Sequence, residues 1–160
     1  MTPLSNKRIS MTLARRWWPA VAWAAVIFCF STDYFSEPHT AGFLTPFLAW
    51  LFPAITPEHT AIVHRLLRKF GHFSEYFILA VLLMSALKGN DNGQSIRRSA
   101  SWTLVIVLLY AASDEFHQSF VASRSATLKD VFIDFTGGMC GTIWTCWRHW
   151  RAHVDSTTSK

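Results

Sequence analysis

Residues 69–87 read KFGHFSEYFILAVLLMSAL, the segment that most clearly indicates a membrane helix. Four ionisable side chains gather at its start: Lys69, His72, Glu75 and Tyr76. The rest is a nearly continuous apolar run, and about 20 such residues suffice to cross the roughly 30 Å hydrocarbon core of a bilayer as one helix. Charged groups at membrane depth are costly, so a polar cluster in this place marks a candidate functional site. We therefore expect a membrane helix with a site at one end.

The composition of the whole chain supports this interpretation. Hydrophobic residues make up 51% of the 160 residues, aromatic residues 15% and charged residues only 16%. This length is typical of one domain. Four segments approach the length of a membrane span: Trp17–Tyr34, Phe70–Leu87, Ala100–His117 and Val131–Trp147. The first could instead be a cleaved signal peptide, but no small-x-small cleavage site follows it, which favours a retained helix.

A fifth apolar segment, Gly42–Ile55, is shorter and contains Pro46 and Pro53. Its length and prolines favour a re-entrant or interfacial segment over a span. The sequence thus predicts an all-α integral membrane bundle of four transmembrane helices, with a short re-entrant or interfacial segment between the first two. The expected division of the chain is a cytoplasmic tail over 1–16, a membrane domain over 17–150 and a second cytoplasmic tail over 151–160.

The basic residues set the expected orientation. With both termini in the cytoplasm, ten of the 15 Lys and Arg residues fall on the inner side, as the positive-inside rule requires. We therefore expect a multi-pass protein of the bacterial cytoplasmic membrane. Most carboxylates fall in the outer half, so the net charge of +5 reflects topology and gives little support for a nucleic-acid partner.

Two further polar clusters are predicted at the same outer depth. One closes the third span and consists of Asp114, Glu115, His117 and Gln118. The other opens the fourth span, where a helical turn of 3.6 residues puts Asp130, Asp134, Gly137 and Gly141 on one face. Arg124 lies in the short loop between these two spans. We expect the three clusters to form one outer-leaflet site.

Structural roles are the alternative for several of these residues. Gly137 and Gly141 have the spacing of a helix-packing motif, which we expect to be their main role. Arg65, Arg68 and Lys69 are candidates for interfacial anchors, and His72 with Glu75 for a structural polar pair. Cys29, Cys140 and Cys146 lie in apolar segments without metal-binding spacing, so we expect small buried hydrophobic side chains there.

In order and spacing, these motifs resemble the VanZ-like family of small bacterial membrane proteins. The resemblance is carried by Lys69-x-x-His72-x-x-Glu75-Tyr76, by Ser113-Asp114-Glu115-x-His117-Gln118, by Arg124 with Asp130, and by Gly137 with Gly141. It covers about residues 60–147. The family usually has Asn where this chain has Asp134, and an added carboxylate there calls for protonation or a bound cation. The resemblance implies a link to low-level resistance to the lipoglycopeptide teicoplanin.

Three functions are compatible with these residues. The first is a site that binds or modulates an envelope lipid headgroup, a lipid-linked envelope precursor or a lipoglycopeptide, because cations hold phosphate while carboxylates accept from donors. The second is an intramembrane enzyme using a divalent metal or acid–base chemistry, with His72, Glu75, Glu115, His117 and Asp130 as candidate residues. The third is a small transporter or scaffold. We expect binding rather than catalysis, no nucleotide cofactor, and membrane lipids as partners; the sequence sets no oligomeric state.

Overall fold

The computed structural model describes residues 3–32, 37–88, 96–120 and 127–158, with side chains placed from residue 14 to residue 155 outside the gaps and residues 37–39. These residues form five helices: α1 (Pro3–Phe30), α2 (Glu37–Leu51), α3 (Pro57–Lys88), α4 (Ile96–Gln118) and α5 (Leu128–Thr158). The all-α prediction is confirmed. The four predicted spans lie almost wholly within α1, α3, α4 and α5, although Tyr34 at the end of the first lies outside the described residues.

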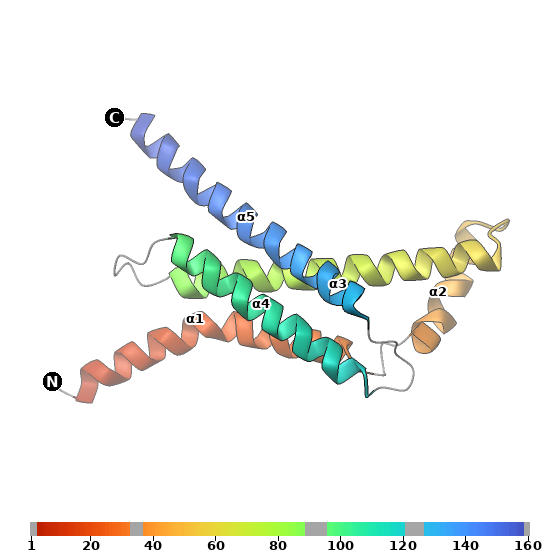
Figure 1. The fold of residues 1–160 in the computed structure, drawn as a ribbon, viewed down its shortest axis with the longest axis horizontal. Coiled ribbons are helices and arrows are strands. Elements are labelled where there is room, and N and C mark those ends of the chain that lie inside the picture. Colours follow the sequence, from red (N-terminus) through yellow and green to blue (C-terminus); the bar gives the residue numbers. More distant parts are fainter. Residues whose placement is uncertain (1–2, 33–36, 89–95, 121–126, 159–160) are drawn as a thin grey trace.

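The long helix α3 is the centre of the bundle. Figure 1 shows α5 crossing it obliquely, α4 beside both of them, and α1 along the opposite side. The contact between α3 and α5 is the most extensive, and α4 contacts both. The two ends of the chain lie at the same end of the bundle, where α3 ends and α4 begins (Figure 1). The other end collects the last turns of α1 and α4 and the first turn of α5.

The segment expected to be re-entrant or interfacial contains a helix. α2 includes Pro46 and ends at Leu51, before Pro53, and it packs against the first turns of α3. Buried Leu48 lies on this helix, and Thr45 Oγ1 lies 3.4 Å from Nε2 of buried His64. The first half of α3 thus extends beyond the other long helices and carries α2 on its side (Figure 1).

A small apolar core joins α1, α3 and α4. Its buried members are Ala20, Ile27, Tyr76, Leu79, Ala80, Leu83, Val107 and Ala111. Two side chains anchor α1 to this core, because the indole N–H of Trp23 donates to the Glu75 carbonyl at 2.9 Å and the Tyr110 hydroxyl donates to the Ala24 carbonyl at 2.6 Å. Each bond links α1 to a different helix.

Among the described residues, α3 is the one helix that meets the length and hydropathy expected of a membrane span, and residues 40–51 of α2 form a shorter apolar helix. The remaining long helices carry the other polar clusters and charged ends, which lower their mean hydropathy. The expected small buried cysteines are half-buried at Cys140 and Cys146, whereas Cys29 is exposed, contrary to the prediction, because its side of α1 faces outward.

Candidate functional site

A cavity of about 600 Å³ opens at the end of the bundle that holds the predicted polar clusters. All five helices contribute to its lining. One part of the wall is apolar and includes Ile27 and Phe30 of α1, Leu44 of α2 and Leu67 of α3. The rest of the lining is largely polar and includes charged side chains of both signs. The cavity can therefore hold a molecule with an apolar part and an ionic part.

Basic side chains from two helices line the polar part. They are Arg65, Arg68 and Lys69 of α3 and Lys129 of α5. Arg65, Lys69 and Lys129 are exposed, whereas Arg68 is half-buried and its Nη2 is shielded from solvent without a hydrogen-bond partner. A buried guanidinium nitrogen without an acceptor costs free energy, and an anion in the cavity would supply that acceptor.

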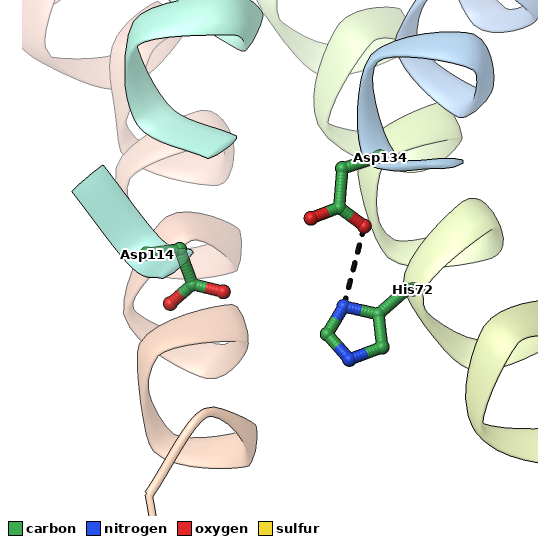
Figure 2. Close-up of side chains that lie close together, drawn as sticks. All are labelled: His72, Asp114 and Asp134. Atoms are coloured by element: carbon green, nitrogen blue, oxygen red, sulfur yellow. Dashed lines mark ion pairs between the residues drawn. The ribbon is translucent and has the colours of Figure 1, made fainter. Parts of the chain in front are cut away.

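Three side chains from three helices meet beside this cavity, and two of them, His72 and Asp114, line it. Figure 2 shows the imidazole of His72 on α3 facing the carboxylate of Asp134 on α5, with Asp114 of α4 turned toward the same space. Nδ1 of His72 lies 3.2 Å from Oδ1 of Asp134. The exposed fractions are 8% for His72, 4% for Asp114 and 1% for Asp134, so this cluster is almost closed to solvent.

Glycines set the register that brings His72 and Asp134 together. A Cβ at Gly137 would lie 2.2 Å from the Phe73 carbonyl oxygen, and one at Gly141 would lie 2.4 Å from the Phe77 carbonyl oxygen. Only glycine lets the two backbones approach this closely. Asp134 precedes Gly137 by about one turn on the same face of α5, which places its carboxylate opposite His72.

Two more buried polar residues surround the cluster. Nε2 of Gln118 donates to Oδ2 of Asp114 at 3.1 Å. Gln118 is the last residue of α4, so its amide holds the carboxylate one turn earlier on the same helix. Tyr76 is 0% exposed, and its hydroxyl has no hydrogen-bond partner. Its ring packs 6.1 Å from that of Tyr110, and it interacts electrostatically with Asp114 and Asp134. The cluster therefore sits among buried polar atoms with unused bonding capacity.

Glu115 and Asp130 have different surroundings. The Glu115 carboxylate accepts the backbone N–H of Thr127, the residue before α5. The Thr127 hydroxyl donates to the Asp130 carboxylate at 3.0 Å and accepts the Asp130 backbone N–H at 3.3 Å. These contacts cap α5, because the first N–H groups of a helix need acceptors from outside it. Asp130 also lines the cavity, whereas Glu115 does not.

The remaining predicted residues occupy separate places. Lys69 and Glu75 line the cavity, and Glu75 is half-buried. His117 faces α1 instead, with its ring 4.7 Å from that of Phe28. Arg124 lies outside the described residues. Of the five residues expected as metal candidates, His72 belongs to the buried cluster, while Glu115 and Asp130 take part in the cap of α5.

Sequence reasoning did not identify two features of the site. It treated Arg68 as an interfacial anchor, although Arg65, Arg68 and His72 follow the i, i+3, i+7 spacing of one helix face and all line the cavity. It also did not anticipate that α2 contributes to the lining, with Leu44 in the apolar wall and Thr40 one turn earlier on the same helix. The first had a signal in the spacing, whereas the second depends on where α2 docks.

Comparison with known proteins supports the resemblance seen in the motifs. No curated protein and no solved structure gives a significant match to the chain. A family model described as VanZ/LLP1 matches residues 17–149, which is most of the chain and includes every described residue of the cavity and the cluster. Members of this family are generally membrane proteins. The chain therefore belongs to the VanZ/LLP1 family.

Proposed function

We propose that this protein crosses the cytoplasmic membrane with α1, α3, α4 and α5. The outward faces of these helices support the proposal, because large apolar side chains are exposed along them. On α4 they recur at Trp102, Val105, Leu109 and Phe116, and on α5 at Phe132, Met139, Ile143 and Trp150. Their steps of three, four and seven residues place them along one side of each helix, while polar residues such as Asp114 and Asp134 are buried. A contiguous apolar surface of this extent needs a partner, and lipid is the partner that covers all sides.

The proposed orientation places the cavity in the outer leaflet. Both ends of the chain lie at the end of the bundle opposite the cavity (Figure 1). Arg97 and Arg98 at the start of α4 and Arg148 and Arg151 near the end of α5 lie toward that same end. With the other basic residues assigned to that side they make up ten of the 15 Lys and Arg residues, against five on the cavity side. The side with more positive charge faces the cytoplasm, so the proposal places the cavity on the outer side.

The proposed ligand is the anionic headgroup of an envelope lipid. The observation that carries this proposal is the buried, unpartnered Nη2 of Arg68 in a cavity that also has an apolar wall. Arg68, Lys69 and Lys129 would hold phosphate, since charge-assisted contacts from Arg and Lys are the strongest that phosphate makes. The apolar wall at Phe30, Leu44 and Leu67 would accept the start of an acyl or polyprenyl chain.

The acidic side of the cavity narrows the ligand class further. Glu75 and Asp130 line the same cavity as the basic residues. Carboxylates repel a bare phosphate but accept hydrogen bonds from hydroxyl, amide or amino groups. A headgroup with phosphate and hydrogen-bond donors therefore fits better than phosphate alone. A lipid-linked envelope precursor and a lipoglycopeptide both have donors beside an apolar chain.

Native mass spectrometry of the purified full-length protein tests this proposal. The probes are phosphatidylglycerol and undecaprenyl phosphate, with phosphatidylcholine as the zwitterionic comparison. We expect Arg68→Gln to weaken binding of both anionic lipids about tenfold or more, because it removes a charge-assisted contact worth about 1.5–3 kcal/mol. Arg98→Gln, at the opposite end of the bundle, should bind like the wild type. Equal binding by the Arg68→Gln variant would show that the cavity does not select anions.

A further inference from the structure

We propose that His72, Asp114 and Asp134 bind one divalent metal ion beside the cavity. One nitrogen of His72 and one oxygen of each aspartate all lie within 4.8 Å of one another. Each residue comes from a different helix, α3, α4 or α5. A bound ion would therefore cross-link the three helices that contact one another most. The metal site requires nothing of the proposed lipid ligand.

The distances are close to those of an occupied site. Zinc binds imidazole nitrogen and carboxylate oxygen at about 2.0–2.2 Å, so tetrahedral ligand atoms lie about 3.4 Å apart. The 3.2 Å between Nδ1 of His72 and Oδ1 of Asp134 already has this spacing. The Asp114 carboxylate has to move inward by about an ångström or more, which a rotation of its side chain can supply.

Unpartnered buried atoms point to a ligand at this place. Oδ1 of Asp114 and both carboxylate oxygens of Asp134 are shielded from solvent and have no hydrogen-bond partner. Asp134 is 1% exposed, and the other two members of the cluster approach it from α3 and α4. His72 faces Oδ1 of Asp134 and Gln118 bonds Oδ2 of Asp114, but the other two oxygens have no partner. A buried carboxylate oxygen without a partner costs free energy, and a cation would supply that partner. The tyrosine hydroxyl of Tyr76 beside them is a further buried group with unused bonding capacity.

A divalent metal ion would satisfy this site more completely than protons. Two ionised aspartates and a neutral imidazole carry a charge of −2, which one divalent ion neutralises. Protonating His72 and one aspartate also gives a neutral cluster, but the remaining carboxylate then has only its histidine contact. A metal ion instead contacts an oxygen of each aspartate as well as His72, which lowers the cost of burying these polar groups.

The ligand set also indicates the class of metal. Imidazole nitrogen suits zinc and other transition metals, whereas all-oxygen sites suit magnesium and calcium. One histidine with two carboxylates therefore fits Zn²⁺ or Mn²⁺. His72 and Asp114 also line the cavity, so a three-ligand site has its open coordination position toward the cavity. A phosphate oxygen of the proposed lipid would occupy that position, and this one step rests on the proposed function.

Metal content measured by mass spectrometry tests the proposal directly. Purified full-length protein is stripped with a chelator, then equilibrated with Zn²⁺, Mn²⁺ or Mg²⁺ in detergent. We expect one Zn²⁺ or Mn²⁺ ion per chain and no stoichiometric Mg²⁺. Loss of an outer partner of a metal ligand costs about 10- to 100-fold in affinity, so Asp134→Asn and His72→Ala should each weaken binding by at least as much.

Asp130→Asn is the matched control. Asp130 is a carboxylate in the same cavity, but it is held by Thr127 and lies outside the cluster. This variant should bind metal like the wild type, and so should Arg68→Gln, which tests the lipid proposal separately. In a second measurement, visible absorption of the Co²⁺-loaded protein should show a coordinated ion that Asp134→Asn loses. Absence of saturable binding by the wild type, or unchanged affinity in Asp134→Asn, would overturn the metal site.

Discussion

Glu115 lies in the last turn of α4, and its carboxylate accepts the backbone N–H of Thr127, the residue before α5. Thr127 in turn bonds Asp130 through its hydroxyl. The three residues fasten the end of one helix to the start of the next. At the residue scale, a carboxylate that the sequence places in a ligand site therefore has a structural use that only the position of α5 reveals.

Replacing Glu115 in two ways separates these roles. Glu115→Gln keeps an oxygen acceptor for the Thr127 N–H, whereas Glu115→Ala leaves that N–H without it. We expect Glu115→Ala to lower the free energy of unfolding by about 1–3 kcal/mol, and Glu115→Gln to lower it much less. Thermal unfolding of the purified protein in detergent measures the difference. Equal stability of the two variants would contradict the capping role.

At the scale of elements, the contact between α3 and α5 fixes the geometry of the site. Gly137 and Gly141 lie against the backbone of Phe73 and Phe77. The same approach presents Gly138 to α4, since a Cβ there would lie 2.4 Å from Val107 Cγ1. Two faces of one short stretch of α5 are thus closely packed against two helices. Any movement of this crossing also moves Asp134 relative to His72.

A single methyl group at the crossing tests this interpretation. Gly137→Ala places a Cβ against a backbone carbonyl that cannot move by itself, so we expect a loss of about 1–3 kcal/mol in the free energy of unfolding. Gly71→Ala, on α3, meets no atom within 4 Å and should keep or raise stability, because alanine favours helix more than glycine does. Thermal unfolding in detergent compares the two. A Gly137→Ala variant as stable as the wild type would show that the helices separate easily.

The sequence predicted the helices better than it predicted their contacts. Apolar runs identify the middle of α3, α4 and α5. The helices extend beyond these runs through polar residues such as Glu58 and Arg148, and a pattern of hydropathy alone does not show that polar residues continue a helix. Helical spacing correctly placed Asp130 and Asp134 on one face. It could not pair His72 with Asp134 and Asp114, because that pairing depends on how α5 crosses α3 and on the register set by Gly137.

Across the protein as a whole, polar and apolar surfaces alternate along the length of the helix bundle: the ends are polar and the flanks are apolar. The cavity and cluster lie at one end of the bundle, and both ends of the chain lie at the other (Figure 1). Large apolar side chains cover the flanks of the helices between these ends. This arrangement fits a bundle whose long axis lies along the bilayer normal. The two ends of the protein would then face opposite sides of the membrane.

Labelling of single cysteines in intact cells tests the orientation. In a background with Cys29, Cys140 and Cys146 replaced by Ala, Ser119→Cys lies at the cavity end and Ala152→Cys near the end of α5; both positions are exposed. We expect a membrane-impermeant maleimide to label Ser119→Cys in intact spheroplasts, and Ala152→Cys only after permeabilisation. The reverse pattern would place the cavity in the inner leaflet.

The proposed ligand of the cavity can also be tested in whole cells through tolerance of teicoplanin. If the cavity binds a lipoglycopeptide or the lipid-linked precursor it targets, expression of the wild-type protein should raise the minimum inhibitory concentration for a teicoplanin-sensitive host. Arg68→Gln should lose this increase, because it removes the buried cation of the cavity, while Arg98→Gln should retain it at equal membrane abundance on immunoblots. Full tolerance with Arg68→Gln would mean that any effect on teicoplanin arises elsewhere on the molecule.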